Sequence, residues 1–245
     1  MSQTLLSGDA RLPIYQRLAD VLRAEVVEGR LRPGDRVPSE SELCERYGLA
    51  LGTVRKGLEI LVAEGLFERF HGRGTFVRRP KFDSSLFRFF RFRGTAGAVT
   101  VPEGRILRRT TETVPGFIAK ALAVPEGSEG ISMSRIRLCD GEPVLAEEIW
   151  LPLPRFADFL SLEIGKVGDL LYPVYDAECQ QLVARAEEQL TAERASEATA
   201  RLLRIEPGTP VIVIDRLARG YDGTPLEWRR SRGRADQFCY QIEIR

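Results

Sequence analysis

The chain has 245 residues, 43% of them hydrophobic and 29% charged, so it is long enough for two domains of modest size, each with its own core. The formal net charge of +1 is unevenly spread: residues 1–80 carry 13 Lys and Arg against 11 Asp and Glu, residues 81–110 carry 7 against 2, and residues 111–245 carry 16 against 22. This distribution excludes a generally polycationic surface and confines contact with nucleic acid to about the first hundred residues.

A first helix is predicted between Pro13, which is favourable in a first turn, and Gly29, which is a frequent helix stop. Apolar residues recur at helical spacing between them, which predicts one buried face. The residues expected on that face are Ile14, Leu18, Val21, Leu22, Val26 and Val27.

A second helix is predicted after the turn at residues 31–36. Ser39 can accept a free backbone N–H, and Glu42, three residues later, can reach back to the backbone of Ser39, which is the pattern of a capping box. This helix is expected to end at Gly48. Its inward residues are expected to be Leu43, Cys44 and Tyr47.

Residues 49–52 are expected to form the bend into a third helix that ends near Glu64. The exposed start of this helix carries Thr53, Arg55 and Lys56, and its buried side is expected to hold Val54, Leu58, Leu61 and Val62. Two short strands, 66–70 and 75–78, should then flank the turn His71-Gly72-Arg73-Gly74.

Three motifs occur in a fixed order: Gly-Asp-x-Val-Pro-Ser-Glu-x-x-Leu over 34–43, Thr-Val-Arg-Lys-x-Leu over 53–58, and Gly-Arg-Gly-Thr-Phe-Val over 72–77. Together they resemble the DNA-binding domain of the GntR family of bacterial transcription regulators, a winged helix-turn-helix, over residues 12–79. The resemblance implies that the third helix enters the major groove and that the hairpin approaches phosphate or the minor groove. The residues expected to contact DNA are Ser39, Thr53, Arg55, Lys56, His71, Gly72, Arg73 and Gly74. An ordinary three-helix bundle is the alternative interpretation of the helix pattern.

Two positions depart from the family pattern. Family members usually carry arginine after Pro-Ser-Glu and Ser-Arg shortly before Thr-Val-Arg, whereas this chain has Ser41 and Ala50-Leu51. Arginine can bond O6 and N7 of guanine together, and neither serine nor leucine can. We therefore predict a shifted or relaxed operator sequence.

Residues 80–96 are predicted to form a linker arm. Phenylalanine and arginine are interleaved over residues 87–93, which favours an extended segment with one aromatic and one basic edge. Packing of the phenylalanines on the next domain is the favoured interpretation, and stacking of single-stranded bases is the alternative.

The second half of the chain contains an internal repeat. Residues 119–128 match residues 200–209 at an offset of 81, and residues 137–143 match residues 219–225 at an offset of 82. Each unit is predicted to contain a helix end, a glycine turn, a strand, an Asp-Gly bend and a returning strand. The predicted strands are 131–138, 144–151, 211–217 and 226–231.

The segment 155–199 joins the two units, and its content of Glu, Ala and Arg predicts a long helix from about Ala184. The two helix–hairpin units are expected to form one antiparallel sheet with helices alongside, which gives the chain an α+β fold class. A cleft between related units suits a small molecule better than a polymer.

This half resembles the UTRA domain, the effector-sensing domain of the HutC subfamily of GntR regulators, which shares the chorismate lyase fold, over residues 97–245. The segments that carry the resemblance are Ser134–Leu138, Asp140–Pro143, Leu151–Pro152, Leu171–Tyr172 and Arg234–Phe238. It implies an effector cleft in which Arg135 and Arg137, two residues apart on a strand and so on one face, meet a carboxylate or phosphate. The implied ligand-binding residues are Arg135, Arg137, Glu147, Tyr172 and Glu227. A solvated strand edge is the alternative for the two arginines.

The likeness to members that sense phosphorylated sugars is incomplete. Those members tend to have serine just before Leu-Tyr and tyrosine shortly before Arg-x-Asp, where this chain has Leu170 and Gly233. A smaller or more apolar anion is therefore expected.

These features predict an effector-responsive DNA-binding transcription regulator, expected to be a repressor that a small anionic metabolite releases from a double-stranded operator. A homodimer is expected because one winged domain makes few contacts with DNA. A lyase or hydrolase activity on the second domain is the alternative function, but the chain has no histidine after His71 and no glycine-framed nucleophilic serine.

The cysteines and the apolar segments indicate the compartment, and the cysteines fit a reducing one. The four cysteines lie far apart, which predicts neither a disulfide framework nor a zinc site, and no metal or cofactor is expected. No stretch approaches the roughly 20 apolar residues that cross a bilayer, and the start lacks the pattern of a signal peptide. A cytoplasmic protein without membrane contact is the expectation.

Overall fold

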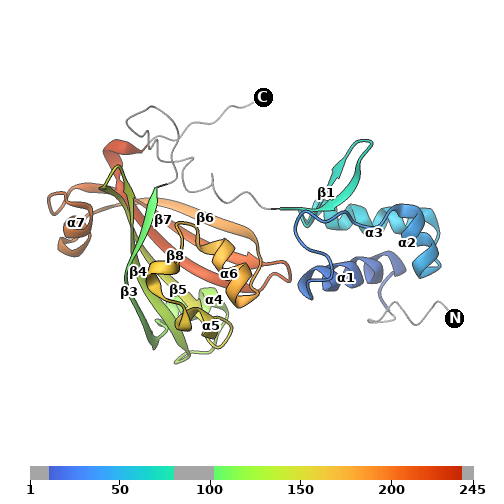
Figure 1. The fold of residues 1–245 in the computed structure, drawn as a ribbon, viewed down its shortest axis with the longest axis horizontal. Helices are drawn as coiled ribbons and strands as arrows, with labels where there is room; N and C mark the ends of the chain where they lie inside the picture. Colours follow the sequence, from blue (N-terminus) through green and yellow to red (C-terminus); the bar gives the residue numbers. More distant parts are fainter. Residues whose placement is uncertain (1–10, 80–101, 239–245) are drawn as a thin grey trace. The chain divides into compact units, whose positions relative to one another are not determined.

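The computed structural model describes residues 11–79 and 102–238 (Figure 1). The chain divides into two compact units, Met1–Pro80 and Lys81–Arg245. The arm predicted over residues 80–96 lies outside the described residues. No helix among the described residues has the length and apolar character needed to cross a membrane.

The described part of the first unit is helical and ends in a hairpin. Its elements are α1 (Ile14–Val27), α2 (Glu40–Tyr47), α3 (Leu51–Ala63), β1 (Phe67–Phe70) and β2 (Gly74–Val77). The predicted capping box at the start of α2 is present, since the Ser39 hydroxyl accepts the Glu42 N–H at 3.3 Å and the Glu42 carboxylate accepts the Ser39 N–H at 2.6 Å. Gly48 ends α2 in the left-handed conformation, with φ of 65°.

The core of this unit lies between α1 and α3. Leu18, Leu22 and Val26 are buried as predicted, but the terminal residues Ile14 and Val27 are each 49% exposed, so their predicted burial is wrong. The residues that are only half-buried, where full burial was predicted, are Val21, Cys44 and Val62. Helix α3 starts at Leu51, within the predicted bend.

The hairpin is an antiparallel pair in which Phe67 faces Val77 and Phe70 faces Gly74. An isolated bridge between Arg36 and Phe76 places the segment before α2 beside β2. The turn between the strands needs glycine, because Gly72 and Gly74 have φ of 71° and 109°.

The second unit is built on one six-stranded sheet with strand order β3-β4-β5-β8-β7-β6, and every pairing in it is antiparallel. Its strands are β3 (Glu103–Thr113), β4 (Glu129–Cys139), β5 (Glu142–Pro152), β6 (Val183–Arg194), β7 (Pro210–Gly220) and β8 (Pro225–Arg234). Its α-helices are α4 (Gly116–Leu122), α5 (Ala157–Ser161), α6 (Leu171–Cys179) and α7 (Glu197–Leu203), and single 3-10 turns occur at Ile164–Lys166 and Ala235–Gln237.

The predicted hairpins are confirmed, whereas the predicted helix from Ala184 is wrong because that segment is the edge strand β6. Helix-favouring residues form a strand here because β6 pairs along its length with β7. Over most of β6, more buried and more exposed side chains alternate, as they do on a strand with one covered face. The carboxylate of Glu188, for example, binds the guanidinium of the cross-strand Arg216. Tertiary pairing therefore outweighs local helix propensity.

The internal repeat is longer than the sequence match indicates. Each repeat unit is a strand, a short helix and a hairpin: β3-α4-β4-β5 in the first and β6-α7-β7-β8 in the second. The two repeats join where β5 pairs with β8, and this pairing includes Trp150 opposite Trp228. The sheet therefore consists of two related halves side by side.

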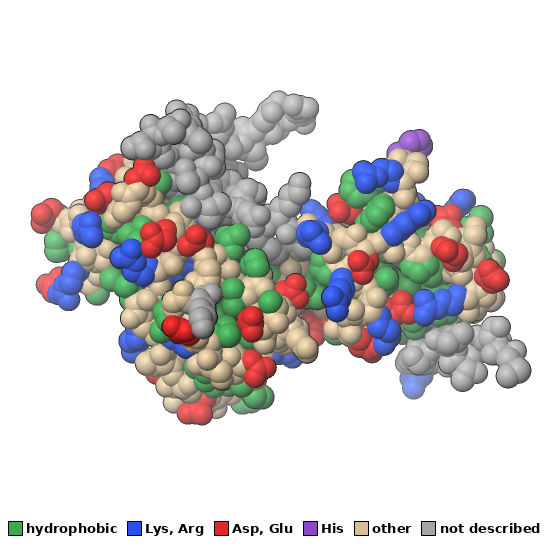
Figure 2. Space-filling model, viewed as in Figure 1, with side chains coloured by type: hydrophobic (Ala, Val, Ile, Leu, Met, Phe, Trp, Pro, Cys, Tyr) green, Lys and Arg blue, Asp and Glu red, His purple; other side chains and the backbone are tan. Residues whose placement is uncertain are grey.

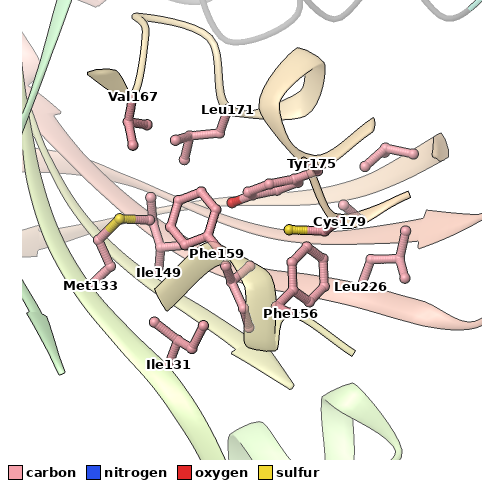
Figure 3. Packing of buried hydrophobic residues seen from close by; sticks show 13 residues of the cluster. Ile131, Met133, Ile149, Phe156, Phe159, Val167, Leu171, Tyr175, Cys179 and Leu226 are labelled. Carbon is pink, nitrogen blue, oxygen red and sulfur yellow. The ribbon is translucent and has the colours of Figure 1, made fainter. Parts of the chain in front are cut away.

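Helices cover both faces of the sheet. On β5, Ile149 and Leu151 belong to a core with α5 and α6, whereas Trp150 between them belongs to a core with α4, so these helices lie on opposite faces. Figure 3 shows the first core, in which the Tyr175 ring contacts Phe156 and Phe159 edge to face at centroid distances of 5.0 and 5.6 Å. The face under α5 and α6 also carries the charged residues described below.

Candidate functional site

The first unit presents cations around the start of α3. Arg55 is exposed, and its Nε donates to Oε2 of Glu40, the first residue of α2, at 2.8 Å. Arg69 on β1 lies 3.6 Å from the same carboxylate. Lys56 turns toward α1, where its Nζ lies 4.0 Å from the centre of the Tyr15 ring, and Thr53 is half-buried. The structure therefore places Arg55, rather than Lys56, beside α2 and the hairpin.

A cleft of about 480 Å³ separates the hairpin from the start of α2. Its lining includes four of the residues predicted to contact DNA, which are Ser39, His71, Gly72 and Gly74. Arg73 is exposed in the hairpin turn, with its guanidinium 5.6 Å from the Phe70 ring. Figure 2 shows Lys and Arg side chains over the hairpin and α3 on the drawn face of this unit. Exposed cations around a glycine turn can meet the phosphates of a duplex.

The second unit holds a buried cluster of charged side chains beneath α6. Arg135 and Arg137 on β4 are only 1% and 2% exposed, so the alternative of a solvated strand edge is wrong. Both point to the same side as predicted, because both donate to the backbone carbonyl oxygen of Asp169, Arg137 from Nη1 at 2.5 Å. Among the described residues, Nη1 of Arg135 has no hydrogen-bond acceptor.

Two carboxylates lie between the arginines of this cluster. Glu147 on β5 lies 3.5 Å from Nε of Arg135 and 3.4 Å from Nη1 of Arg229. Glu227 on β8, which is fully buried, accepts from Arg229 at 2.6 Å and from the hydroxyl of Tyr175 at 2.7 Å. Glu147 therefore pairs with arginines on the two neighbouring strands, and Glu227 pairs with Arg229 along β8.

Tyr172 connects α6 with this cluster. Its hydroxyl donates to Glu227 at 3.2 Å and accepts from Nη1 of Arg216 at 3.3 Å. The structure thus brings together the five predicted ligand-binding residues and adds others to them. The added residues are Asp169, Tyr175, Glu188, Arg216 and Arg229.

The loop before α6 lies directly against Arg135. Asp169 accepts the backbone N–H of Gly104 on β3 at 2.7 Å with its carboxylate, while its carbonyl meets the two arginines. A Cβ at Gly104 would collide with the Arg135 guanidinium. Asp169 therefore binds residues of both β3 and β4 and covers the charged cluster.

The two central arginines differ in how well their charge is compensated. Burial lowers the pKa of Arg135 despite the nearby carboxylate of Glu147. Burial acts in the same direction at Arg229, but there Glu227 and Glu147 outweigh it and hold the pKa well above its ordinary value. Of these two arginines, Arg135 thus has the less compensated charge, and a further anion would stabilise it more than Arg229.

Alkaline pH should destabilise the second unit through Tyr172. Burial, followed by the charge of Glu227, raises the pKa of Tyr172 from 10.0 to about 12. A phenol whose pKa is higher in the folded state stabilises the fold below pH 10 and loses that contribution between pH 10 and about 12. The free energy of unfolding of Tyr172→Phe should therefore fall by about 2 kcal/mol less than that of the native protein over this pH interval.

Urea unfolding of both proteins, followed at several pH values by tryptophan fluorescence, measures this difference. Both tryptophans of the chain, Trp150 and Trp228, lie in the second unit, so the signal reports on that unit. An equal decline in the native protein and in Tyr172→Phe would contradict the assignment.

Both units of the chain match families of known proteins. Residues 14–77 match the model of the bacterial regulatory proteins of the gntR family, and residues 98–239 match the UTRA domain. The chain is 28% identical over 241 residues to the HTH-type transcriptional repressor NagR of Bacillus subtilis, with 96% of each protein covered. It is 26% identical to the mannosyl-D-glycerate transport/metabolism system repressor MngR of Escherichia coli, over 94% of the chain and 95% of that protein.

The fold is also found in solved structures. The crystal structure of PhnF from Mycobacterium smegmatis matches 91% of this chain and 98% of its own, with a TM-score of 0.54 and 24% identity. The UTRA match covers more than half of the chain, and the relatives match both units in order. The chain therefore belongs to the GntR family of bacterial regulators that carry a UTRA domain, as in the HutC subfamily, and it is an effector-responsive DNA-binding transcription regulator rather than an enzyme.

Proposed function

We propose that this protein is a cytoplasmic repressor that binds its operator as a homodimer and is released by a small organic anion. Relatives that match nearly the whole chain are named as repressors, which supports the direction of regulation. A two-fold dimer would present two copies of α3 to two half-sites and so double the contacts with DNA.

On the DNA side, we propose that α3 lies in the major groove while the hairpin follows the phosphate backbone. Arg55 and Arg73 are exposed and can reach phosphate, and the glycines of the hairpin turn allow close approach of the backbone. The residues proposed to contact or frame DNA are Ser39, Thr53, Arg55, Lys56, His71, Gly72, Arg73 and Gly74.

The observation that carries the effector proposal is the convergence of Arg135 and Arg137 on a single carbonyl oxygen. A backbone carbonyl is neutral, whereas a carboxylate or phosphate offers two or more charged acceptors to the same guanidinium groups. Nη1 of Arg135, for which the described part of the chain offers no acceptor, is a further buried donor that such a group can satisfy. We therefore propose that the anion of the effector replaces the Asp169 carbonyl.

A carboxylate is the favoured anion. Leu170, directly before α6, offers no hydroxyl to a phosphate, and Gly233 on β8 offers no side chain. MngR, one of the relatives, is named for mannosyl-D-glycerate, a compound with a carboxylate group. Glu147, Tyr172 and Glu227 are proposed to bind the hydroxyl groups or other polar groups of the same molecule.

Release of DNA follows if the effector prefers the conformation that does not fit the operator. Displacing Asp169 removes its link to Gly104 and changes how the loop before α6 lies on the sheet. A tenfold loss of operator affinity requires a preference of only about 1.4 kcal/mol between the two conformations.

Thermal unfolding of the full chain in the presence of single anions tests the proposal. The panel contains sugar acids, short hydroxy acids and sugar phosphates, each also added to a complex with duplexes selected from genomic DNA. At a hundred times its dissociation constant a true effector should stabilise the protein by about 2.7 kcal/mol and should release DNA.

The matched variants are Arg135→Met, in the cluster, and Arg204→Met, on the surface. Arg135→Met should keep operator binding and lose the response to the anion, whereas Arg204→Met should keep both, because the Arg204 side chain lies on the surface, where it pairs with the exposed Glu142. Loss of the response in both variants, or a response of Arg135→Met equal to that of the native protein, would contradict the proposed site.

A further inference from the structure

An apolar side chain is exposed on the first turn of α3. Leu51 is the first residue of this helix and is 43% exposed. A Cβ at the next residue, Gly52, would have no neighbour within 4 Å, and Ala50 before it is small. The surface around Leu51 is therefore open, and a flat partner can reach the leucine.

The place of Leu51 indicates what covers it. Single exposed leucines are common on protein surfaces and need no partner. Leu51, however, lies one helical turn before Arg55, and residues four apart in a helix share a side. Arg55 in turn joins α3 to α2 and the hairpin through Glu40, which also pairs with Arg69. Leu51 thus continues the surface proposed to meet the duplex.

The edges of base pairs in the major groove offer hydrogen-bond donors and acceptors and one apolar group, the C5-methyl of thymine. Leucine cannot form a hydrogen bond through its side chain, so only that methyl group complements it. We propose that Leu51 is a specificity residue that packs against the methyl group of a thymine in each half-site. The inference rests on the proposed position of α3 in the major groove. It specifies the predicted change of operator sequence as a preference for thymine at one position of each half-site.

Deoxyuridine tests this contact because it differs from thymine only by the missing methyl group. Duplexes bound by the native full-length protein are first selected from a random library, and each thymine of the half-site is then replaced singly by deoxyuridine. Burying one methyl group accounts for about a fourfold change in affinity. The native protein should lose about that factor at one position of each half-site, as measured by fluorescence anisotropy.

Substitutions at Leu51 connect the effect to the side chain. Leu51→Ala should bind thymine and deoxyuridine equally at that position while keeping its discrimination elsewhere, and Leu51→Met should retain the preference for thymine. Val27→Ala removes methyl groups from a similarly exposed residue at the end of α1 and should behave as the native protein. Circular dichroism and melting of each variant show that the fold is kept.

Four results overturn the inference. Undiminished discrimination by Leu51→Ala, or a native protein insensitive to deoxyuridine throughout the half-site, shows that Leu51 does not contact a thymine methyl. A Leu51→Ala protein that changes its sedimentation coefficient and keeps its discrimination shows that a second copy of the chain covers the leucine. Failure to select any duplex contradicts the proposed DNA contact itself, and with it this inference.

Discussion

Glu227→Ala is expected to lower the free energy of unfolding of the second unit by about 3–5 kcal/mol. Glu227 is fully buried and accepts hydrogen bonds from Arg229, Tyr175 and Tyr172. Without this carboxylate, Glu147 at 3.4 Å remains as a carboxylate partner of Arg229 in the described part of the chain, and the hydrogen bonds that the two phenol hydroxyls donate to Glu227 are lost. A buried cation that loses one of its two carboxylate partners is costly, because an apolar interior solvates charge poorly.

Urea unfolding at neutral pH, followed by tryptophan fluorescence, measures this loss in the second unit alone. Glu227→Gln should be less destabilising, since the amide oxygen still accepts hydrogen bonds. Glu142→Ala is the matched control, because Glu142 is 73% exposed and makes one surface ion pair at 3.5 Å, which stabilises little. A loss no larger for Glu227→Ala than for Glu142→Ala would show that the cluster does not stabilise the fold.

The double variant Arg55→Ala, Arg73→Ala is expected to bind its operator roughly ten-thousandfold more weakly at low salt, because in a dimer the two substitutions remove four charged interactions with phosphate, each about tenfold in affinity. Both arginines are exposed on the surface that carries α3 and the hairpin. Each arginine that no longer neutralises a phosphate also makes the slope of log affinity against log salt shallower by about 0.9. In a dimer the two substitutions occur twice, so the slope should become shallower by about 3.6.

Anisotropy titrations between low and physiological salt provide both quantities. Arg204→Ala, which removes one exposed positive charge from the second unit, should leave the slope unchanged. The proposed interface is wrong if the double variant keeps the native slope, or if Arg204→Ala makes the slope equally shallow.

The elements of the first unit follow from local signals, and the sequence therefore predicts them well. The capping box at Ser39, the left-handed Gly48 and the glycine turn of the hairpin are each determined by residues a few positions apart. Burial at the ends of α1 depends instead on where α3 lies. The exposed Ile14 and Val27 therefore could not be predicted from periodicity alone.

In the second unit, long-range pairing decides what the sequence leaves open. Strand β6 has a helix-like composition, and the pairing with β7 that makes it a strand joins positions such as Glu188 and Arg216. The internal repeat could have predicted this strand. Extended at nearly the same offset, it places β6 before α7 where β3 stands before α4. The same offsets align Arg135 with Arg216 and Glu147 with Arg229.

Those alignments could have identified two site residues that the sequence pattern alone did not reveal. Arg216 and Arg229 occupy, in the second half of the sheet, the places of Arg135 and Glu147 in the first. Asp169 could not have been found in this way, because it acts through its backbone carbonyl, and its position depends on how the loop before α6 folds over the sheet.

Glu40 has a consequence for how the regulator searches a chromosome. Its carboxylate holds Arg55 and Arg69 before any duplex arrives, so under the proposed DNA contact each encounter exchanges this carboxylate for a phosphate. Random stretches offer phosphates alone and gain little from that exchange, whereas an operator adds contacts with its bases. An internal competitor of this kind shortens residence on the millions of wrong positions and leaves more molecules free to reach the right one.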